Sequence, residues 1–344
     1  MKKYLISENG NFYKANLHCH TNCSDGKLTP ADVKELYKKL GYSIVAYTDH
    51  DILVPHDDLN DEEFLALHGF EMEINEPKKA EFVSIKTCHI CFIGIDPENV
   101  TQPMWHREGD KLYLFGNAPK YMSVIKYDEN EPDYVREYSH EKISEIMNIA
   151  REKGFFVTYN HPTWSLENYS DYIGYHGMHA MEMFNGGCNA AGYNDRNDHA
   201  YDDILRGGER IYCIGADDNH NYGNPNARRF DSGWAWTMIK ADSLDYKDVT
   251  RALLDGNFYA SEGPEITELW YEDGKVHVEC PNADRVSIVA DMRYANMVCG
   301  ENGNTIDSAE LPVDQRAKWF RLTVYDKQGR QACTNAYFLD EINK

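Results

Sequence analysis

Histidines and carboxylates recur in this sequence directly after short apolar segments. His18 and His20 follow the apolar segment Tyr13–Leu17. Two residues spaced i and i+2 on an extended strand point to the same side, so both imidazoles can reach one metal ion. Asp25 follows in a Ser-Asp-Gly turn. Because Asp is also an ordinary turn residue, the pattern alone leaves Asp25 open between a metal ligand and a turn residue.

Two further acidic groups end apolar segments. Asp49, His50 and Asp51 follow Ser43–Tyr47. Three ionisable side chains are costly to bury without partners, and a metal ion would convert that cost into coordination. The alternative is that Asp49 or Asp51 caps a helix. Glu71 could bridge two metal ions because a carboxylate has two oxygens, although a Glu considered alone is more often a solvated surface residue.

Three more segments add histidines or aspartates. His89 lies in a segment rich in Ile, Cys and Phe, where a satisfied core histidine is the alternative. His161 stands between an Asn and a Pro, and the Pro makes a rigid bend there. The run from Asp217 to His220 follows Ile211–Gly215. Imidazoles and carboxylates with few thiolates suit zinc, iron(II) or manganese, and neither a GxSxG motif nor a P-loop is present.

The elements that position these groups alternate between strands and helices. Capping residues and glycine stops predict helices at 30–40, 139–153, 198–206 and 246–254. Such alternation predicts a parallel sheet or a barrel, with the site at the carboxyl ends of the strands. We expect a barrel because the ligands come from many strands and must converge on one point.

Two parts of the chain differ from this pattern. Residues 264–344 alternate like half-buried strands, with a hairpin turn at Asp273-Gly274, and predict a small antiparallel β domain after a barrel domain at 1–263. Residues 97–138 are rich in Trp, Tyr, Pro and charge. They are either a lid over the site or a surface excursion.

The composition excludes some classes of partner. The 344 residues carry a formal net charge of -22, which disfavours binding to long nucleic acid through its phosphates. Bound metal ions would supply a local positive field for an anionic substrate. The start of the chain lacks a signal-like apolar region, and no run of 18 apolar residues occurs. With nine scattered cysteines, we expect a cytoplasmic protein with reduced thiols and no membrane partner.

The motifs HxH, SDG, TDHD, GxE, a strand His, NHP and a final GxD…H occur here in the order of one known family. Over roughly residues 13–235 the chain resembles the PHP (polymerase and histidinol phosphatase) superfamily, whose members include metal-dependent phosphoesterases. The resemblance implies an α/β fold: a distorted, TIM-like (β/α)7 barrel with two or three divalent metal ions at its C-terminal face. The segment 259–264 also resembles PHP hydrolases that carry a small β domain.

The same resemblance implies three ligand groups. They are His18, His20 and Glu71 with an Asp of the final motif; Asp25, His50 and His220; and Glu71, His89 and His161. The family usually ends in Gly-x-Asp-x-His, whereas this chain has one extra residue. Asp217 matches by its distance from Gly215, and Asp218 matches by its distance from His220. We favour Asp217 and keep Asp218 as the alternative.

The expected reaction is hydrolysis of a phosphate monoester by a metal-activated hydroxide. The substrate would be a small phosphorylated metabolite or a nucleotide. Arg228 and Arg229 are expected to clamp the phosphate, unless they form surface salt bridges. His220 or His199 is the candidate acid for the leaving group. The alternatives are a metal-dependent amide, carbamate or ester hydrolase and a non-catalytic, metal-stabilised binding module.

Overall fold

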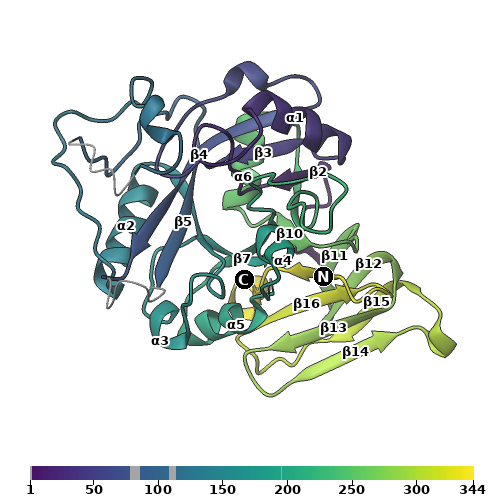
Figure 1. Cartoon of the computed structure of the whole chain (residues 1–344). Helices are drawn as coiled ribbons and strands as arrows, with labels where there is room; N and C mark the ends of the chain where they lie inside the picture. The colour runs from purple at the N-terminus through teal and green to yellow at the C-terminus, as the bar shows by residue number, and fades with distance from the viewer. Residues whose placement is uncertain (1, 78–85, 108–113, 195) are drawn as a thin grey trace.

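Two β-sheets with flanking helices build the fold (Figure 1). The computed structural model describes residues 2–77, 86–107, 114–194 and 196–344. The large sheet is mixed and follows the order β14-β13-β16-β17-β10-β9-β2-β3-β4-β5-β6-β7-β8, with β18 beside β16. The small sheet is antiparallel, in the order β1-β11-β12-β15. The prediction of an α/β fold with a separate antiparallel sheet is therefore confirmed.

The elements have the following bounds. The large sheet contains β2 (Asn11–Asn16), β3 (Ile44–Tyr47), β4 (Leu65–Asn75), β5 (Thr87–Gly94), β6 (Phe155–Asn160), β7 (Ala180–Asn185), β8 (Tyr212–Ala216), β9 (Trp236–Ala241), β10 (Phe258–Ser261), β13 (Arg285–Ala290), β14 (Ala295–Cys299), β16 (Trp319–Tyr325), β17 (Gln331–Thr334) and β18 (Tyr337–Phe338). The small sheet contains β1 (Lys3–Tyr4), β11 (Glu268–Glu272), β12 (Lys275–Ala283) and β15 (Ile306–Pro312). The helices are α1 (Pro30–Lys39), α2 (His140–Glu152), α3 (Tyr169–Tyr172), α4 (Gly186–Ala191), α5 (Asp198–Gly207), α6 (Tyr246–Leu254) and α7 (Leu339–Ile342), with short 3-10 turns at Asp57–Leu59, Ala118–Lys120 and Glu301–Gly303.

The four predicted helices are confirmed as α1, α2, α5 and α6. Thr29 caps α1 by accepting from the backbone N–H of Asp32, and Pro30 takes the first helical position. Ser139 caps α2 in the same way. Each helix turns one apolar side to the sheet, and α6 buries Val249 and Leu253. Local capping chemistry and apolar spacing therefore suffice to place these helices.

Between β2 and β8, the strand directions differ from the predicted parallel order at β5. The pairs β2–β3, β3–β4, β6–β7 and β7–β8 are parallel, but β5 runs antiparallel to both β4 and β6. The beginning of β5 therefore lies beside the carboxyl-terminal halves of its neighbours. His89 pairs with Glu73 on one side and with Asn160 on the other. This reversal brings a histidine from the start of a strand to the edge where the other strands end.

The opposite ends of these strands are sealed by an apolar cluster. It draws buried side chains from β2 through β9, from β10 and from α6: Ala15, Ile44, Leu65, Ile93, Phe156, Ala180, Ile214, Ile239, Phe258, Val249 and Leu253 are among its members. Burial of each Val, Leu, Ile or Phe side chain in this cluster contributes roughly 1.5–3 kcal/mol. These strands therefore carry the polar residues at one end and the apolar cluster at the other.

The C-terminal strands continue the large sheet. β10 pairs with β9 on one side and with β17 on the other, so one sheet crosses the predicted boundary between 1–263 and 264–344. The N-terminal strand β1 pairs with β11 and joins the C-terminal region, as Figure 1 shows. The predicted hairpin between β11 and β12 is confirmed, with positive φ angles at Asp273 (50°) and Gly274 (80°).

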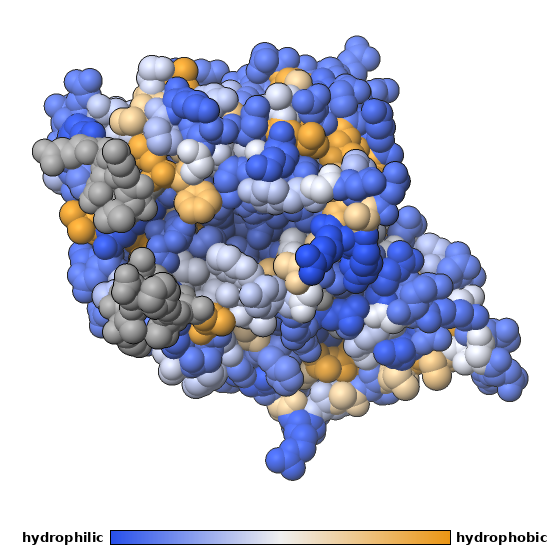
Figure 2. Space-filling view, in the orientation of Figure 1, coloured by the Kyte–Doolittle hydropathy of each residue, from blue (hydrophilic) through white to orange (hydrophobic). Residues whose placement is uncertain are grey.

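Hydrophilic residues cover most of the face drawn in Figure 2. Among the described residues, no helix has the length and apolar character needed to cross a bilayer. The described parts of 97–138 include the bridge between Thr101 and Lys126 and the turn at Ala118–Lys120. Residues 108–113 of this predicted lid lie outside the described residues.

One half-buried histidine at the apolar end of the strands, His179, predicts a pH effect on stability. Burial, with a smaller contribution from nearby Arg151, lowers the pKa of His179 to about 4. Its Nδ1 accepts from the backbone N–H of Val157, 3.0 Å away. Between the unfolded pKa of about 6.5 and the folded value, the unfolded chain binds more protons, so stability falls as the pH falls through this window.

We therefore expect His179→Asn, which keeps an acceptor for Val157, to flatten this dependence. Urea unfolding of the chelator-treated wild type and variant at pH 7, 6, 5 and 4 measures the free energy of unfolding. The difference between the two proteins should shift steadily in favour of the variant as the pH falls. A difference that is independent of pH would contradict the assignment.

Candidate metal centre

Backbone pairing beyond the strand ends brings the first and last motifs together. The segment after β2 pairs with the segment after β8 at Cys19 and Asn219. The His20 N–H donates to the Asn219 carbonyl and the Asp218 N–H donates to the His18 carbonyl, both at 3.0 Å. Residues about 200 positions apart thus face one another across the same edge.

Glu71 lies at the middle of the resulting cluster and is fully buried. Its Oε1 lies 3.2 Å from His18 Nε2, 3.0 Å from His89 Nδ1 and 3.4 Å from His161 Nε2. Its Oε2 lies 3.4 Å from His20 Nε2 and 3.1 Å from His50 Nδ1. A single carboxylate therefore contacts five imidazoles that come from four different segments.

Asp218 forms a second point of convergence. Its Oδ1 lies 3.3 Å from His18 Nε2 and 3.1 Å from His20 Nε2, and these two ring nitrogens are 3.0 Å apart. Its Oδ2 lies 3.7 Å from His161 Nε2. Two imidazole nitrogens at this separation repel one another unless a proton or a cation lies between them. The geometry therefore favours a bound cation at this point.

A third group adjoins the first two. The Oδ2 of Asp25 lies 3.3 Å from His220 Nε2, and its Oδ1 lies 4.0 Å from His50 Nε2 and from His20 Nδ1. Ligand atoms of all four residues lie within 4.8 Å of one another. Two similar groups share a residue with it, namely His18 with His20 and Asp218, and His50 with Glu71 and His89. A further group, His18 with Glu71 and His161, shares residues with both of these. The side chains of all three predicted ligand groups thus lie together. The grouping differs from the prediction in that His20 also belongs with Asp25, His50 and His220, and His18 also belongs with Glu71 and His161.

The donor atoms fit divalent metal ions. Among the described residues, the buried atoms His20 Nδ1 and His89 Nε2 have no hydrogen-bond partner. His50 Nδ1 and Glu71 Oε2 face each other without the orientation of a hydrogen bond. Unpaired buried polar atoms are costly, and coordination would remove that cost. Imidazole nitrogens with carboxylate oxygens are a donor set for zinc, iron or manganese.

The electrostatics keep the carboxylates ionised. Burial alone would raise the pKa of Glu71, but His18, His89 and His50 hold it well below its usual range. Burial and the neighbouring His20 lower the pKa of His50 well below its usual value. Burial opposes the charge on His18 as well, but Asp218, Cys91, Glu71 and Glu182 together raise its pKa. A cation that binds here would therefore displace protons.

The preference for Asp217 over Asp218 is not supported by the geometry. Asp217 turns away from the cluster and accepts from the backbone N–H groups of Gly233 (2.7 Å), Trp234 (2.9 Å) and Ala235 (3.0 Å). Asp218 has a φ of 50°, and its carboxylate faces His18 and His20. The extra residue of the final motif is therefore accommodated by a left-handed turn, and Asp218 becomes the candidate ligand.

Glu182 supports the centre from behind and was missed by the sequence analysis. It is fully buried in β7, and its Oε1 lies 2.6 Å from His18 Nδ1. Its Oε2 accepts from the His161 backbone N–H and from Asn185 Nδ2. Such a carboxylate fixes the tautomer and orientation of a ligand histidine. The available signal was a charged residue inside the apolar run Ala180–Phe184.

The predicted catalytic residues other than His220 lie elsewhere. Arg228 and Arg229 are exposed. Arg228 donates to Asn189 and its guanidinium carbon lies 4.2 Å from the centroid of the Trp234 ring. His199 is exposed on α5. Among the described residues, none of these three side chains lines the cavity over the cluster. Neither a phosphate clamp nor the acid role of His199 is therefore supported by their positions.

A cavity of about 320 Å³ opens above the cluster. Candidate ligands form its floor, and Glu73, Phe115, Trp164, Cys188, Tyr222 and Asp231 are among the other lining residues. The segment 97–138 supplies Phe115, whose turn is held at Gly116 (φ 55°) and by a hydrogen bond from Asn117 N–H to the Ser24 carbonyl. Arg136 holds the far end of the segment on Asp51. For this segment, the two predicted alternatives of a lid over the site and a surface excursion both stay predictions.

A neighbouring group of Cys23, Asp49 and His56 also offers three possible ligand atoms. The carboxylate of Asp49 already accepts from the backbone and hydroxyl groups of Thr21 and Ser24, at 2.7–3.1 Å. These bonds shape the loop that carries His20 and Asp25. We therefore assign Asp49 a supporting role in the loop.

Comparisons with known proteins give the following picture. No protein-family model and no curated protein matches the chain. Among solved structures, it is similar to a two-domain protein of Bacteroides vulgatus that contains a predicted PHP-like metal-dependent phosphoesterase (14% identity, TM-score 0.45, covering 98% of this chain and 97% of that one). It is also similar to a candidate metal-dependent phosphoesterase of Bifidobacterium adolescentis (17%, 0.37, 64% and 91%) and to an amidohydrolase of Chromobacterium violaceum with bound sulfate and no metal (16%, 0.34, 61% and 88%).

The two aspartates of the final motif predict opposite phenotypes. Asp217→Ala leaves the N–H groups of the half-buried Gly233 and Trp234 and of the buried Ala235 unpaired, so we expect it to lower the free energy of unfolding of the metal-free protein by about 3 kcal/mol. Asp218→Ala should instead lower the bound metal content and change the stability of the metal-free protein less. Urea unfolding in chelator and elemental analysis of the reloaded proteins measure both quantities. If Asp217→Ala lowered the metal content and Asp218→Ala lowered the stability of the metal-free protein, Asp217 would be the ligand.

Glu182 predicts an effect on affinity without loss of folding. Glu182→Gln keeps the hydrogen bond to the His161 N–H but removes the charge behind His18. We expect the metal dissociation constant to rise 10–100-fold, as for other partners of ligand histidines. Metal titration of the chelator-treated protein measures it, with the surface variant Glu209→Gln as the control. Equal affinities in the two variants would rule out this role.

Proposed function

We propose that this chain is a metal-dependent hydrolase of the PHP type that acts on small phosphate monoesters. The proposal rests on one observation: six imidazoles converge with the carboxylates of Asp25, Glu71 and Asp218 below an open cavity. The names of the similar structures, two phosphoesterases and one amidohydrolase, are in keeping with a metal-dependent hydrolase. The expected substrate is a phosphorylated metabolite or a nucleotide rather than long nucleic acid.

We also propose that β2 to β8 form the distorted (β/α)7 barrel of that family. Two observations support a closed ring. The segments after β2 and β8 pair at Cys19 and Asn219, and Asn16 Oδ1 accepts from the Asp217 N–H at 2.8 Å. The apolar cluster at the other end draws on every strand of the ring. Between β8 and β9, the side chain of Thr237 bonds both the N–H and the carbonyl of Gly215.

The residues of the chain have distinct tasks in this proposal. His18, His20 and Asp218 would hold one ion, Asp25, His50 and His220 a second, and Glu71, His89 and His161 a third. When bound, such ions lower the pKa of water and neutralise charge on a phosphate. Glu182 orients His18, and Glu71 fixes the positions of the three ligand groups relative to one another. This fixed relation reduces the reorganisation that the reaction needs.

Proton supply to the leaving group would have to come from another side chain at the cavity. His220 is a candidate ligand and cannot easily serve both purposes. Asp231 lines the cavity, and burial raises its pKa from the usual range. Its two oxygens accept from the backbone N–H groups of His220 and Asn221. We propose Asp231 for this task because it lines the cavity and lies directly beside His220.

A metal-dependent amide, carbamate or ester hydrolase remains the second candidate. The same ions would act on a carbonyl group, and the name of the Chromobacterium structure favours this class. The two candidates differ in the product that they release. Orthophosphate appears only if a phosphate ester is cleaved.

We expect the metal-loaded protein to release orthophosphate from p-nitrophenyl phosphate and from members of a panel of phosphorylated metabolites. Chelation should abolish the release, and His50→Ala should lower kcat/KM at least 100-fold because one ion loses a ligand. His176→Ala, at an exposed histidine paired with Glu209, is the matched control and should keep full activity. Hydrolysis of amides without any phosphate release would establish the second candidate. Stoichiometric metal with no turnover of either class would leave a binding module.

A further inference from the structure

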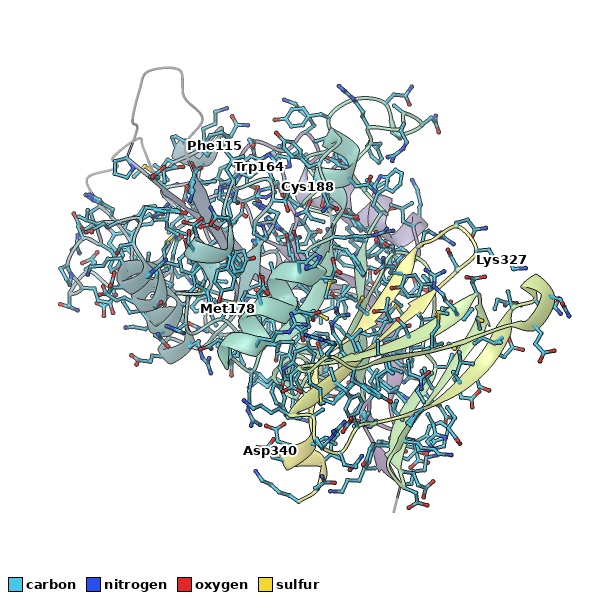
Figure 3. All side chains as sticks on the ribbon, turned by 90° about the horizontal axis from the view of Figure 1, so that it is seen from below. Phe115, Trp164, Met178, Cys188, Lys327 and Asp340 are labelled. Carbon is cyan, nitrogen blue, oxygen red and sulfur yellow. The ribbon has the colours of Figure 1, made fainter. Side chains whose placement is uncertain are left out.

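Three aromatic side chains stand exposed at the cavity over the candidate metal centre, namely Phe115, Trp164 and Tyr222, the last of which is 48% exposed. Phe115 is 49% exposed and Trp164 is 40% exposed, and both line the cavity. In Figure 3 they lie near each other and near Cys188, far from Asp340 at the C-terminal helix. Large aromatic side chains that are half exposed at a cavity indicate a ligand-binding surface more often than a surface without a partner.

Each ring also rests on candidate ligands. The ring centroids of Phe115 and His50 are 5.2 Å apart in an edge-on arrangement. Trp164 lies edge-on to both His89 and His161, at 5.2 Å in each case. These contacts fix the two rings relative to the ions that the histidines would hold. A group bound next to those ions would therefore meet both rings.

A third aromatic residue at the cavity, Tyr222, has other contacts. Its ring stacks on His220 at 5.9 Å and lies under the ammonium of Lys27 at 4.5 Å. Its hydroxyl donates to the Asp25 carbonyl. These contacts occupy Tyr222, so stacking on a substrate is assigned to Phe115 and Trp164.

The charges at the cavity restrict the substrate further. Beside the candidate ligands, Glu73 and Asp231 line it. No Lys or Arg belongs to its lining in the part of the chain that the structure describes. The ions would balance one phosphate, but a second anionic group on the substrate would face carboxylates without a cationic partner.

We propose that the substrates are phosphate monoesters of an alcohol or phenol that carries a planar aromatic ring and no second negative charge. Phe115 and Trp164 are the specificity-determining residues, and they hold the ring while the phosphate meets the ions. This inference rests on the proposed phosphatase function. In the reaction, the oxygen of water bonds to phosphorus, the bond from phosphorus to the ester oxygen breaks, and that oxygen takes up a proton to leave as the free alcohol.

Non-hydrolysable phosphonates test the inference by binding alone. Calorimetric titration of the metal-loaded protein compares phenylphosphonate, methylphosphonate and 4-carboxyphenylphosphonate. We expect phenylphosphonate to bind about tenfold more tightly than methylphosphonate, in line with the strength of aromatic pairs. The added carboxylate should cancel most of that gain. Equal binding of phenyl- and methylphosphonate would overturn the inference while leaving the phosphatase proposal intact, whereas no binding of any phosphonate would count against both.

Variants assign the effect to the two rings. In Trp164→Ala and in Phe115→Ala, the ratio of the methylphosphonate to the phenylphosphonate dissociation constant should fall from about ten towards one. Metal content is measured in each variant, because both rings touch candidate ligands. Tyr169→Ala, which removes a 55% exposed tyrosine outside the cavity lining, should keep the wild-type ratio. An unchanged ratio in both ring variants, or the same fall in Tyr169→Ala, would overturn the assignment.

Discussion

The convergence of basic nitrogens on one buried carboxylate is the interaction on which the rest of this structure depends. Glu71 is fully buried and contacts five imidazoles, while His18 and His20 bring two ring nitrogens to 3.0 Å. Protons alone would satisfy such a cluster poorly, since neighbouring positive rings repel one another at low dielectric. Cations held by the rings and the acids would remove the conflict. The fold must therefore hold these groups in place before any ion arrives.

The acidic residues divide into two kinds that serve this requirement. Asp25, Glu71 and Asp218 turn their oxygens to the histidines, whereas Asp49, Glu182 and Asp217 bond to backbone or ring N–H groups behind them. The second kind shapes the loops that carry the first. Left-handed backbone at Asp51, His161 and Asp218 shows how tightly those loops are determined, because non-glycine residues rarely adopt it.

Much of this arrangement follows from local sequence, and the remainder depends on distant contacts. The spacing of His18 and His20 and the caps of α1 and α2 are local signals, so the sequence predicts them. The reversal of β5 is set by its pairing with β4 and β6, which no local pattern reports. The choice between Asp217 and Asp218 depends on N–H groups of residues 233–235, and the role of Glu182 depends on His18. Long-range partners, rather than residue types, decide these cases.

The overall charge and the proposed substrate can be reconciled on the same grounds. A chain with a net charge of -22 repels anions at long range, so an anion must gain its attraction close to the ions. Bound divalent ions would supply that attraction over a few ångströms and for one phosphate. The walls above them, Phe115 and Trp164 with Glu73 and Asp231, offer stacking surface and further negative charge. Such a cavity distinguishes substrates by the group attached to the phosphate. It favours an aromatic ring and disfavours additional anionic groups.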